Sequence, residues 1–151
     1  MVDEKAIGQK VWVLTEDHYR YTLDKSKVYT VVSIKLYSEV KDHTNHAILR
    51  GEDGKEIEVR DYNVLFMPDP NLEGDEQIAR FLKDNLCYPD CVYTNSEGVT
   101  SVDISWGDWK HEHLWCRDLM GYLGYIETNV EETEEDGSDC YSAIHYFVKN
   151  K

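Results

Sequence analysis

The spacing of apolar residues changes once along this chain, at the segment MPDPNLEGDE (Met67–Glu76). Before it, the apolar residues lie in short β-branched runs typical of strands. After it, Ile78, Phe81, Leu82 and Leu86 follow one another at intervals of three and four, which predicts an amphipathic helix. Two of the chain's three prolines lie in this segment, and prolines interrupt regular structure. We therefore predict two domains, residues 1–67 and 68–151.

The first domain is expected to contain strands and turns. Strands are predicted at Lys10–Thr15 and Lys27–Tyr37, separated by a long loop. The segment His46–Arg60 reads as two further strands, joined by a tight turn at Asp53-Gly54, a dipeptide favoured in hairpins. A short last strand is expected at the end of DYNVLFMP. The first domain is therefore predicted to have five strands.

This order of strands and loops, over about residues 8–67, resembles the small SH3-like β-barrels of bacterial and phage accessory proteins. The resemblance implies a barrel that serves as a scaffold or docking surface. The ALYDY-type motif and the paired tryptophans of the peptide-binding SH3 domains are missing. Binding of proline-rich peptides is therefore not expected.

The second domain is predicted to alternate helices and hairpins. The first helix, capped near Asp75, leads into a hairpin that turns at Ser96-Glu97-Gly98. A second helix is expected from Trp109, after an N-cap at Asp108, to Gly121 or Gly124. A last hairpin turns near Gly137. The fold class is therefore α+β: an SH3-like β-barrel followed by an α+β sandwich, with one antiparallel sheet and two helices.

Negative charge is concentrated in the second domain. The chain carries 30 acidic and 16 basic residues, a net charge of −14. Residues 1–67 contribute 12 acidic and 10 basic residues, whereas residues 68–151 contribute 18 and 6, so the two parts carry −2 and −12. Such a field repels phosphates, so direct nucleic-acid binding is disfavoured, and it attracts a protein partner with a basic surface.

A run of acidic residues near the last turn is the predicted partner-binding surface. Its members are Glu131, Glu132, Glu134, Glu135, Asp136 and Asp139. The run lacks the spacing of a calcium-binding loop, so we interpret it as an electrostatic recognition surface rather than a metal site.

Cysteine and histidine spacing permits a structural zinc site. Cys87 and Cys91 are four residues apart, a spacing found in zinc sites. His113 and Cys116 are three apart and share one face of the predicted helix. Four such ligands would close a structural tetrahedral site. The alternative is that the cysteines are buried thiols without a metal.

A second alternative places a ligand pocket near His113 and His145. On the last predicted strand His145 shares a face with Ala143 and Phe147, so we expect it to be partly buried and hydrogen-bonded. Ser142 is three residues away and is expected on the opposite face, which argues against a hydrolytic triad. A small enzyme or ligand-binding domain would use the two histidines.

The first expectation for function is a non-enzymatic protein-interaction module of bacterial, plasmid or phage origin. Its acidic domain would dock on a basic protein partner and would act as a nucleic-acid-mimicking inhibitor if that partner binds nucleic acid. No targeting signal or long apolar run is present, and no membrane association is expected. A cytoplasmic location with reduced cysteines follows from this reading.

Overall fold

The computed structural model describes residues 3–17, 20–36, 44–108, 112–135 and 140–150. For residues 17, 20, 106–108, 134, 135, 140 and 141 it describes the backbone only. The chain divides into two compact units, Met1–Met67 and Pro68–Lys151. Both are built mainly from antiparallel strands, and the second adds two α-helices, so the fold class is α+β.

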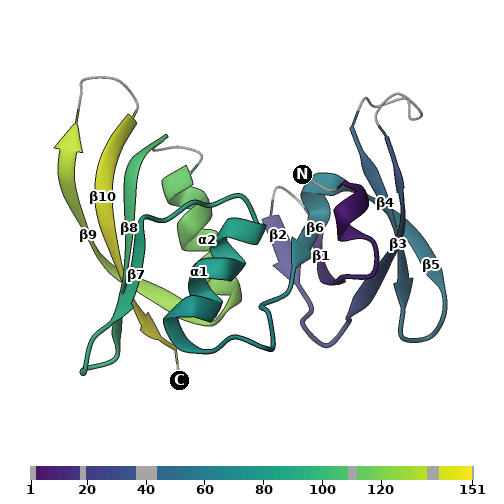
Figure 1. Ribbon diagram of the computed structural model, residues 1–151, viewed down its shortest axis with the longest axis horizontal. Coiled ribbons are helices and arrows are strands. Elements are labelled where there is room, and N and C mark those ends of the chain that lie inside the picture. Colours follow the sequence, from purple (N-terminus) through teal and green to yellow (C-terminus); the bar gives the residue numbers. More distant parts are fainter. Residues whose placement is uncertain (1–2, 18–19, 37–43, 109–111, 136–139, 151) are drawn as a thin grey trace. The chain divides into compact units, whose positions relative to one another are not determined.

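The first unit is a curled sheet (Figure 1). Its strands pair in the order β2-β1-β3-β4-β5, and β6 pairs with β1. The elements are η1 (Glu4–Ala6), β1 (Lys10–Asp17), β2 (Arg20–Leu23), β3 (Tyr29–Lys35), β4 (His46–Gly51), β5 (Glu56–Arg60), η3 (Asp61–Asn63) and β6 (Val64–Phe66). β1 pairs with β3 through Lys10 and Val11 and with β2 through its second half, so it bridges two parts of the sheet.

The core of the first unit follows from strand alternation. Val11, Val31, Ala47 and Leu49 are at most 1% exposed, and they lie on three neighbouring strands. The Asp53-Gly54 turn between β4 and β5 is confirmed, with Gly54 at a φ of +82° that glycine adopts readily. The prediction of one long loop after β1 was wrong, because β2 forms within it and pairs with β1.

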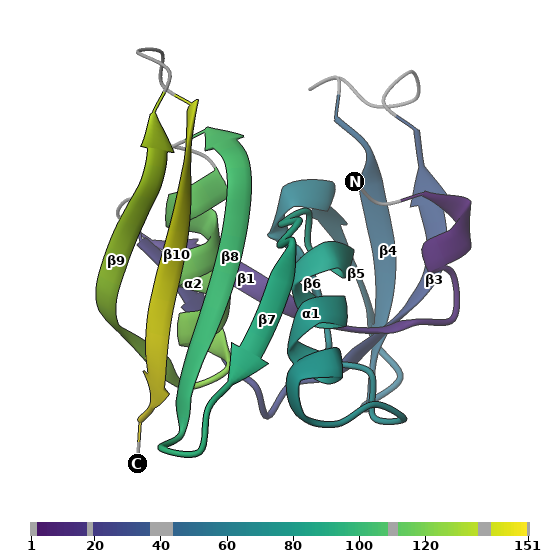
Figure 2. The same cartoon turned by 60° about the vertical axis from the view of Figure 1, so that its left-hand side comes forward.

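The second unit is a four-stranded antiparallel sheet with two helices on one face (Figures 1 and 2). The strand order is β7-β8-β10-β9. The elements are α1 (Gly74–Asp84), β7 (Cys91–Thr94), β8 (Val99–Asp108), α2 (Leu114–Tyr122), β9 (Tyr125–Glu135) and β10 (Cys140–Lys149). None of the described helices is long and apolar enough to cross a membrane.

Alternation along the two central strands gives this sheet its buried face. Thr100, Val102 and Ile104 of β8 lie opposite Phe147, His145 and Ala143 of β10, and all six are at most 1% exposed. The buried helix residues are Ile78, Phe81, Leu82, Cys116, Leu119 and Met120. The core therefore lies between the sheet and the helices.

One detail of the predicted helices was wrong. α1 begins at Gly74 after Glu73, and Asp75 does not cap it; its carboxylate instead accepts hydrogen bonds from the backbone N–H (3.0 Å) and hydroxyl (2.5 Å) of Thr94 in β7. The α-helix α2 runs over Leu114–Tyr122, and residues 112 and 113 form a π-helical turn directly before it. Residues 109–111, where the helix was expected to start, lie outside the described residues.

Candidate functional site

A chain of hydrogen bonds between ionisable side chains lies in the second unit. His113 immediately precedes α2, His145 is on the buried face of β10, and Glu127 is on the neighbouring strand β9. His113 Nδ1 is 2.6 Å from His145 Nε2, and His145 Nδ1 is 2.9 Å from Glu127 Oε2. Arg117 of α2 donates to the other oxygen of Glu127, Oε1, from Nε at 3.1 Å, and its Nη2 lies 3.0 Å from the same oxygen.

One arrangement of protons satisfies both histidine hydrogen bonds while both rings stay neutral. His145 donates its Nδ1 proton to the Glu127 carboxylate, so its Nε2 is left as an acceptor. His113 then donates its Nδ1 proton to that nitrogen. The network therefore selects one tautomer for each ring, and the Arg117 charge stabilises the carboxylate on which it depends.

Burial determines what this network can do. The two histidines are 2% and 1% exposed, and their ring centroids lie 4.9 Å apart. Burial lowers the pKa of His145, although its hydrogen bond to Glu127 acts in the opposite direction. A carboxylate-histidine pair is also found in general-base sites, but a reactant must approach its free nitrogen. Here that nitrogen bonds His113, so the geometry favours a role in packing.

The pKa of His145 predicts a loss of stability in mild acid. The ordinary value is 6.5 and the folded-state pKa is lower, so the unfolded chain binds more protons between these two values. The free energy of unfolding of the second unit should therefore fall as the pH drops below 6.5 towards the folded-state pKa. Urea unfolding followed by amide exchange in β10, at about pH 7.5 and about pH 5.5, measures this effect.

The control is the His145→Gln variant, which cannot titrate at this position and should lose this part of the pH dependence. Asp118 affects stability over a different pH range, because burial raises the pKa of its carboxyl above the ordinary 3.8. The contribution of Asp118 to the free energy of unfolding is present below pH 3.8 and is lost as the pH rises through the raised pKa. An unchanged slope below pH 6.5 in His145→Gln would contradict the assignment to His145.

The residues proposed for zinc binding lie in different environments. Cys87 and Cys116 are buried and in contact, and the Cys87 contact, followed by burial, raises the pKa of the Cys116 thiol. Cys91 is exposed on β7. The His113 ring is hydrogen-bonded to the His145 ring. Within the described part of the chain, which includes all four, no group of three or more His, Cys, Asp or Glu side chains is placed to hold a metal ion.

The predicted acidic surface lies largely on β9. Glu131 and Glu132 are exposed there, and the backbones of Glu134 and Glu135 continue the strand. Asp136 and Asp139 lie outside the described residues. The hydroxyl of Tyr146 in β10 donates to Glu131 Oε2 at 2.9 Å, and this bond raises the pKa of Tyr146. One of the six acidic residues is thus joined to an aromatic side chain of the neighbouring strand.

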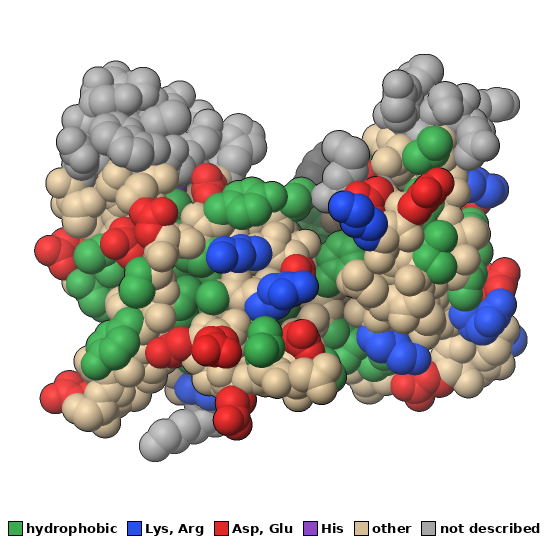
Figure 3. Space-filling model, viewed as in Figure 1, with side chains coloured by type: hydrophobic (Ala, Val, Ile, Leu, Met, Phe, Trp, Pro, Cys, Tyr) green, Lys and Arg blue, Asp and Glu red, His purple; other side chains and the backbone are tan. Residues whose placement is uncertain are grey.

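The Tyr146–Glu131 pair lies on the face of the sheet opposite the helices, which we call the outer face. It comprises the side chains that alternate with the buried ones. The described members are Cys91, Tyr93, Val99, Ser101, Asp103, Ser105, Ile126, Asn129, Glu131, Ile144, Tyr146 and Val148. Tyr93 is 59% exposed and Ile126 is 49% exposed. Figure 3 shows acidic and hydrophobic side chains close together over β9.

Sequence reasoning found part of these arrangements. The burial and hydrogen bonding of His145 are confirmed. The role of Glu127 was missed, since one more acid in an acidic segment carries no distinguishing signal. Ser142 is buried as well as His145, and a bulge interrupts the strand pairing between Ser142 and Ala143.

The fold and these sites define an α+β protein with a curled sheet in one unit and a helix-covered antiparallel sheet in the other. No family model, curated protein or solved structure matches the chain. The functional argument therefore depends on its own residues.

Proposed function

We propose that this chain is a non-enzymatic protein-interaction module, and that the outer face of the β7-β8-β10-β9 sheet docks on a basic segment of a protein partner. The observation that carries the proposal is the combination of exposed aromatic and aliphatic side chains with carboxylates on this face. Tyr93 and Ile126 are about half exposed, and Asp103 and Glu131 lie among them.

The composition of the outer face resembles that of protein interfaces. Tyrosine is enriched at interfaces because its ring contributes a large apolar area and its hydroxyl a hydrogen bond. Tyr93 projects from β7, the first strand of the sheet, while Tyr146 lies on the neighbour of β9 and holds Glu131 in place. A bound partner would cover apolar area and meet oriented carboxylates.

Charge indicates the chemistry of the partner. Residues 68–151 carry 18 acidic and 6 basic residues, a net charge of −12. A field of this sign accelerates association with a basic surface and opposes association with nucleic acid. If the partner's basic surface normally binds nucleic acid, the acidic unit would compete for it. With Cys87, Cys91 and Cys116 as free thiols, we place this activity in the cytoplasm.

A defined peptide tests the docking surface. The probe is a blocked peptide of about eight residues that alternates arginine with leucine, titrated into the isotope-labelled full chain. We expect amide shifts concentrated in β7, β8, β10 and β9. The double variant Asp103→Asn, Glu131→Gln should weaken binding about fivefold, since each exposed ion pair contributes about 0.2–1 kcal/mol.

The matched control removes the same charge elsewhere in the second unit. Glu73 and Glu76 are exposed and lie outside the sheet strands, so Glu73→Gln, Glu76→Gln should change affinity less than about twofold. Equal weakening by the two double variants would show a non-specific charge effect and would overturn the outer face as the docking surface.

The two other functions have direct tests. One zinc ion per chain in protein purified without a histidine tag would support the zinc site, which would require exposed Cys91 to leave the β7 face and join the buried ligands. An enzyme or ligand-binding domain at His113 and His145 would require a ligand whose binding perturbs the signals of both buried rings.

A further inference from the structure

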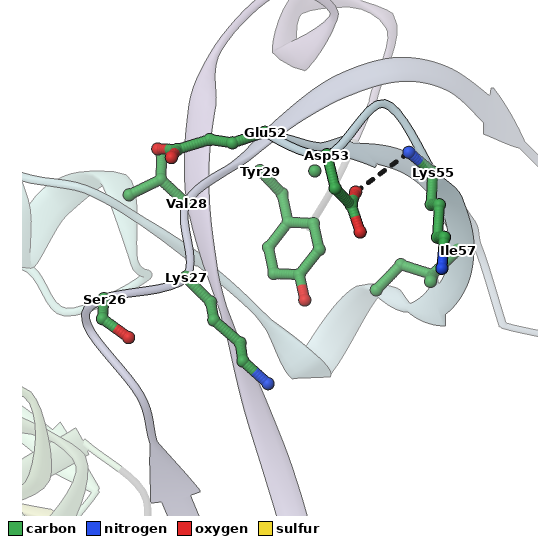
Figure 4. A pocket seen from close by; sticks show the side chains of 9 residues that line it. Ser26, Lys27, Val28, Tyr29, Glu52, Asp53, Lys55 and Ile57 are labelled. Carbon is green, nitrogen blue, oxygen red and sulfur yellow. Dashed lines mark hydrogen bonds between the residues drawn. The ribbon is translucent and has the colours of Figure 1, made fainter.

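A cavity of about 340 Å³ lies in the first unit, whereas the residues assigned to docking belong to the second. It lies between the segment that leads into β3 and the turn that joins β4 to β5 (Figure 4). The lining residues are Ser26, Lys27, Val28, Tyr29, Gly51, Glu52, Asp53, Lys55 and Ile57. The volume falls in the range of small-molecule and peptide pockets, about 300–1,000 Å³.

A cross-strand pair positions the aromatic wall. Tyr29 of β3 lies directly opposite Gly51 of β4. A Cβ at Gly51 would lie 3.4 Å from the Tyr29 ring and 3.0 Å from Asp53 Oδ1. The absence of a side chain at Gly51 therefore lets the ring lie close to the strand. Ile57, which is 37% exposed, adds a second apolar wall.

The acceptor groups around the cavity are engaged by their own turns. Asp53 Oδ1 accepts the backbone N–H of Lys55 at 3.0 Å. One donor of the lining is also engaged, because the Ser26 hydroxyl donates to Asp24 Oδ1 at 2.5 Å. Glu52 extends towards Val28, away from the hydroxyl end of the Tyr29 ring (Figure 4). The negative charges at the rim are thus partly withdrawn from the cavity.

The remaining side-chain donors of the lining, in contrast, are not engaged. Lys27, Lys55 and the Tyr29 hydroxyl make no side-chain hydrogen bond or ion pair with the residues that the structure describes. Other basic residues of the same sheet are paired: Lys10 with Thr30, Lys35 with Glu58, and Arg50 with Glu56. In Figure 4 the Lys27 side chain extends towards the hydroxyl end of the Tyr29 ring, and Lys55 lies beside Ile57.

From these observations we infer that this cavity binds a carboxylate carried next to an apolar side chain, as on an acidic peptide segment. The carboxylate would be held by Lys27 and Lys55 and would accept the Tyr29 hydroxyl proton. The apolar group would pack on the Tyr29 ring and Ile57. This site would take an acidic ligand, whereas the outer face of the second unit is proposed to take a basic one, so the two proposals fail separately.

Short peptides titrated into the full chain and followed by amide shifts test this site. One arm is acetyl-Gly-Leu-Glu-amide, whose carboxylate is a side chain, and a second is acetyl-Gly-Gly-Leu with a free C-terminal carboxylate. Shifts confined to residues 24–31 and 49–58 in either arm support the site, and the tighter arm identifies the source of the carboxylate. Equally tight binding of acetyl-Gly-Leu-Gln-amide or inorganic phosphate would overturn the inference, as would shifts elsewhere.

Charge-neutral variants supply the second measurement. Lys27→Gln, Lys55→Gln should weaken the tighter peptide about tenfold, and Tyr29→Phe about two- to threefold. The control Lys5→Gln, Lys83→Gln removes the same charge at exposed positions outside the cavity, and it should leave affinity within about twofold. A double variant in the cavity that binds as tightly as the wild type, with an unchanged unfolding midpoint, would also overturn the inference.

Discussion

Replacing His145 with alanine is expected to lower the free energy of unfolding of the second unit by about 3–5 kcal/mol. The ring is 1% exposed and packs between the rings of His113 and Phe147, with centroid distances of 4.9 and 6.4 Å. Its removal leaves a cavity and takes away the partner of His113 Nδ1. Within the network, Glu127 then keeps its ion pair with Arg117 but loses its hydrogen bond to His145.

The measurement is urea unfolding with amide exchange in β8 and β10 as the reporter for the second unit. The matched control is His46→Ala in the first unit, where Nδ1 lies 2.8 Å from Glu58 but the side chain is 14% exposed. That control should cost only about 1 kcal/mol. A loss below about 1.5 kcal/mol in His145→Ala would show that the network does not stabilise the core.

Replacing Phe81 with alanine should destabilise the second unit by about 3–5 kcal/mol, whereas Leu86→Ala should have an effect within about 0.5 kcal/mol. Both residues follow the helical spacing of the sequence. The structure separates them, because Phe81 is fully buried in α1 and Leu86, beyond the end of the helix, is 52% exposed.

A third variant makes this contrast sharper. Leu86 has a φ of +67°, a conformation that costs a non-glycine residue about 1–2 kcal/mol. Leu86→Gly should therefore stabilise the second unit by up to about 1 kcal/mol, as measured by the urea midpoint at constant slope. A destabilisation of 2 kcal/mol or more, about that of a buried leucine, would mean that Leu86 belongs to the core.

Local patterns in the sequence predicted the elements that depend on nearby residues. The helix around Ile78, Phe81 and Leu82 and the turn at Asp53-Gly54 are present, because helix periodicity and turn conformation are short-range properties. The α+β class also follows from them. The SH3-like resemblance of residues 8–67 stays a prediction, as does the bacterial, plasmid or phage origin.

The errors have a common physical origin. The residues of β2 show little strand pattern of their own, and the strand forms because four of them pair with residues of β1. Leu86 leaves the helical face because its backbone turns into the left-handed region after the helix ends. Each outcome depends on a partner or a chain reversal that periodicity does not contain.

By itself, the sequence determined two differently patterned halves, the concentration of negative charge in the second, and the alternation that buries His145. Only the tertiary structure decided which groups meet. It joined Glu127, His145 and His113, separated Cys91 from Cys87 and Cys116, and placed Tyr29 opposite Gly51. Composition and periodicity specify which face a residue occupies, whereas contacts between distant residues depend on strand register, bulges and helix ends.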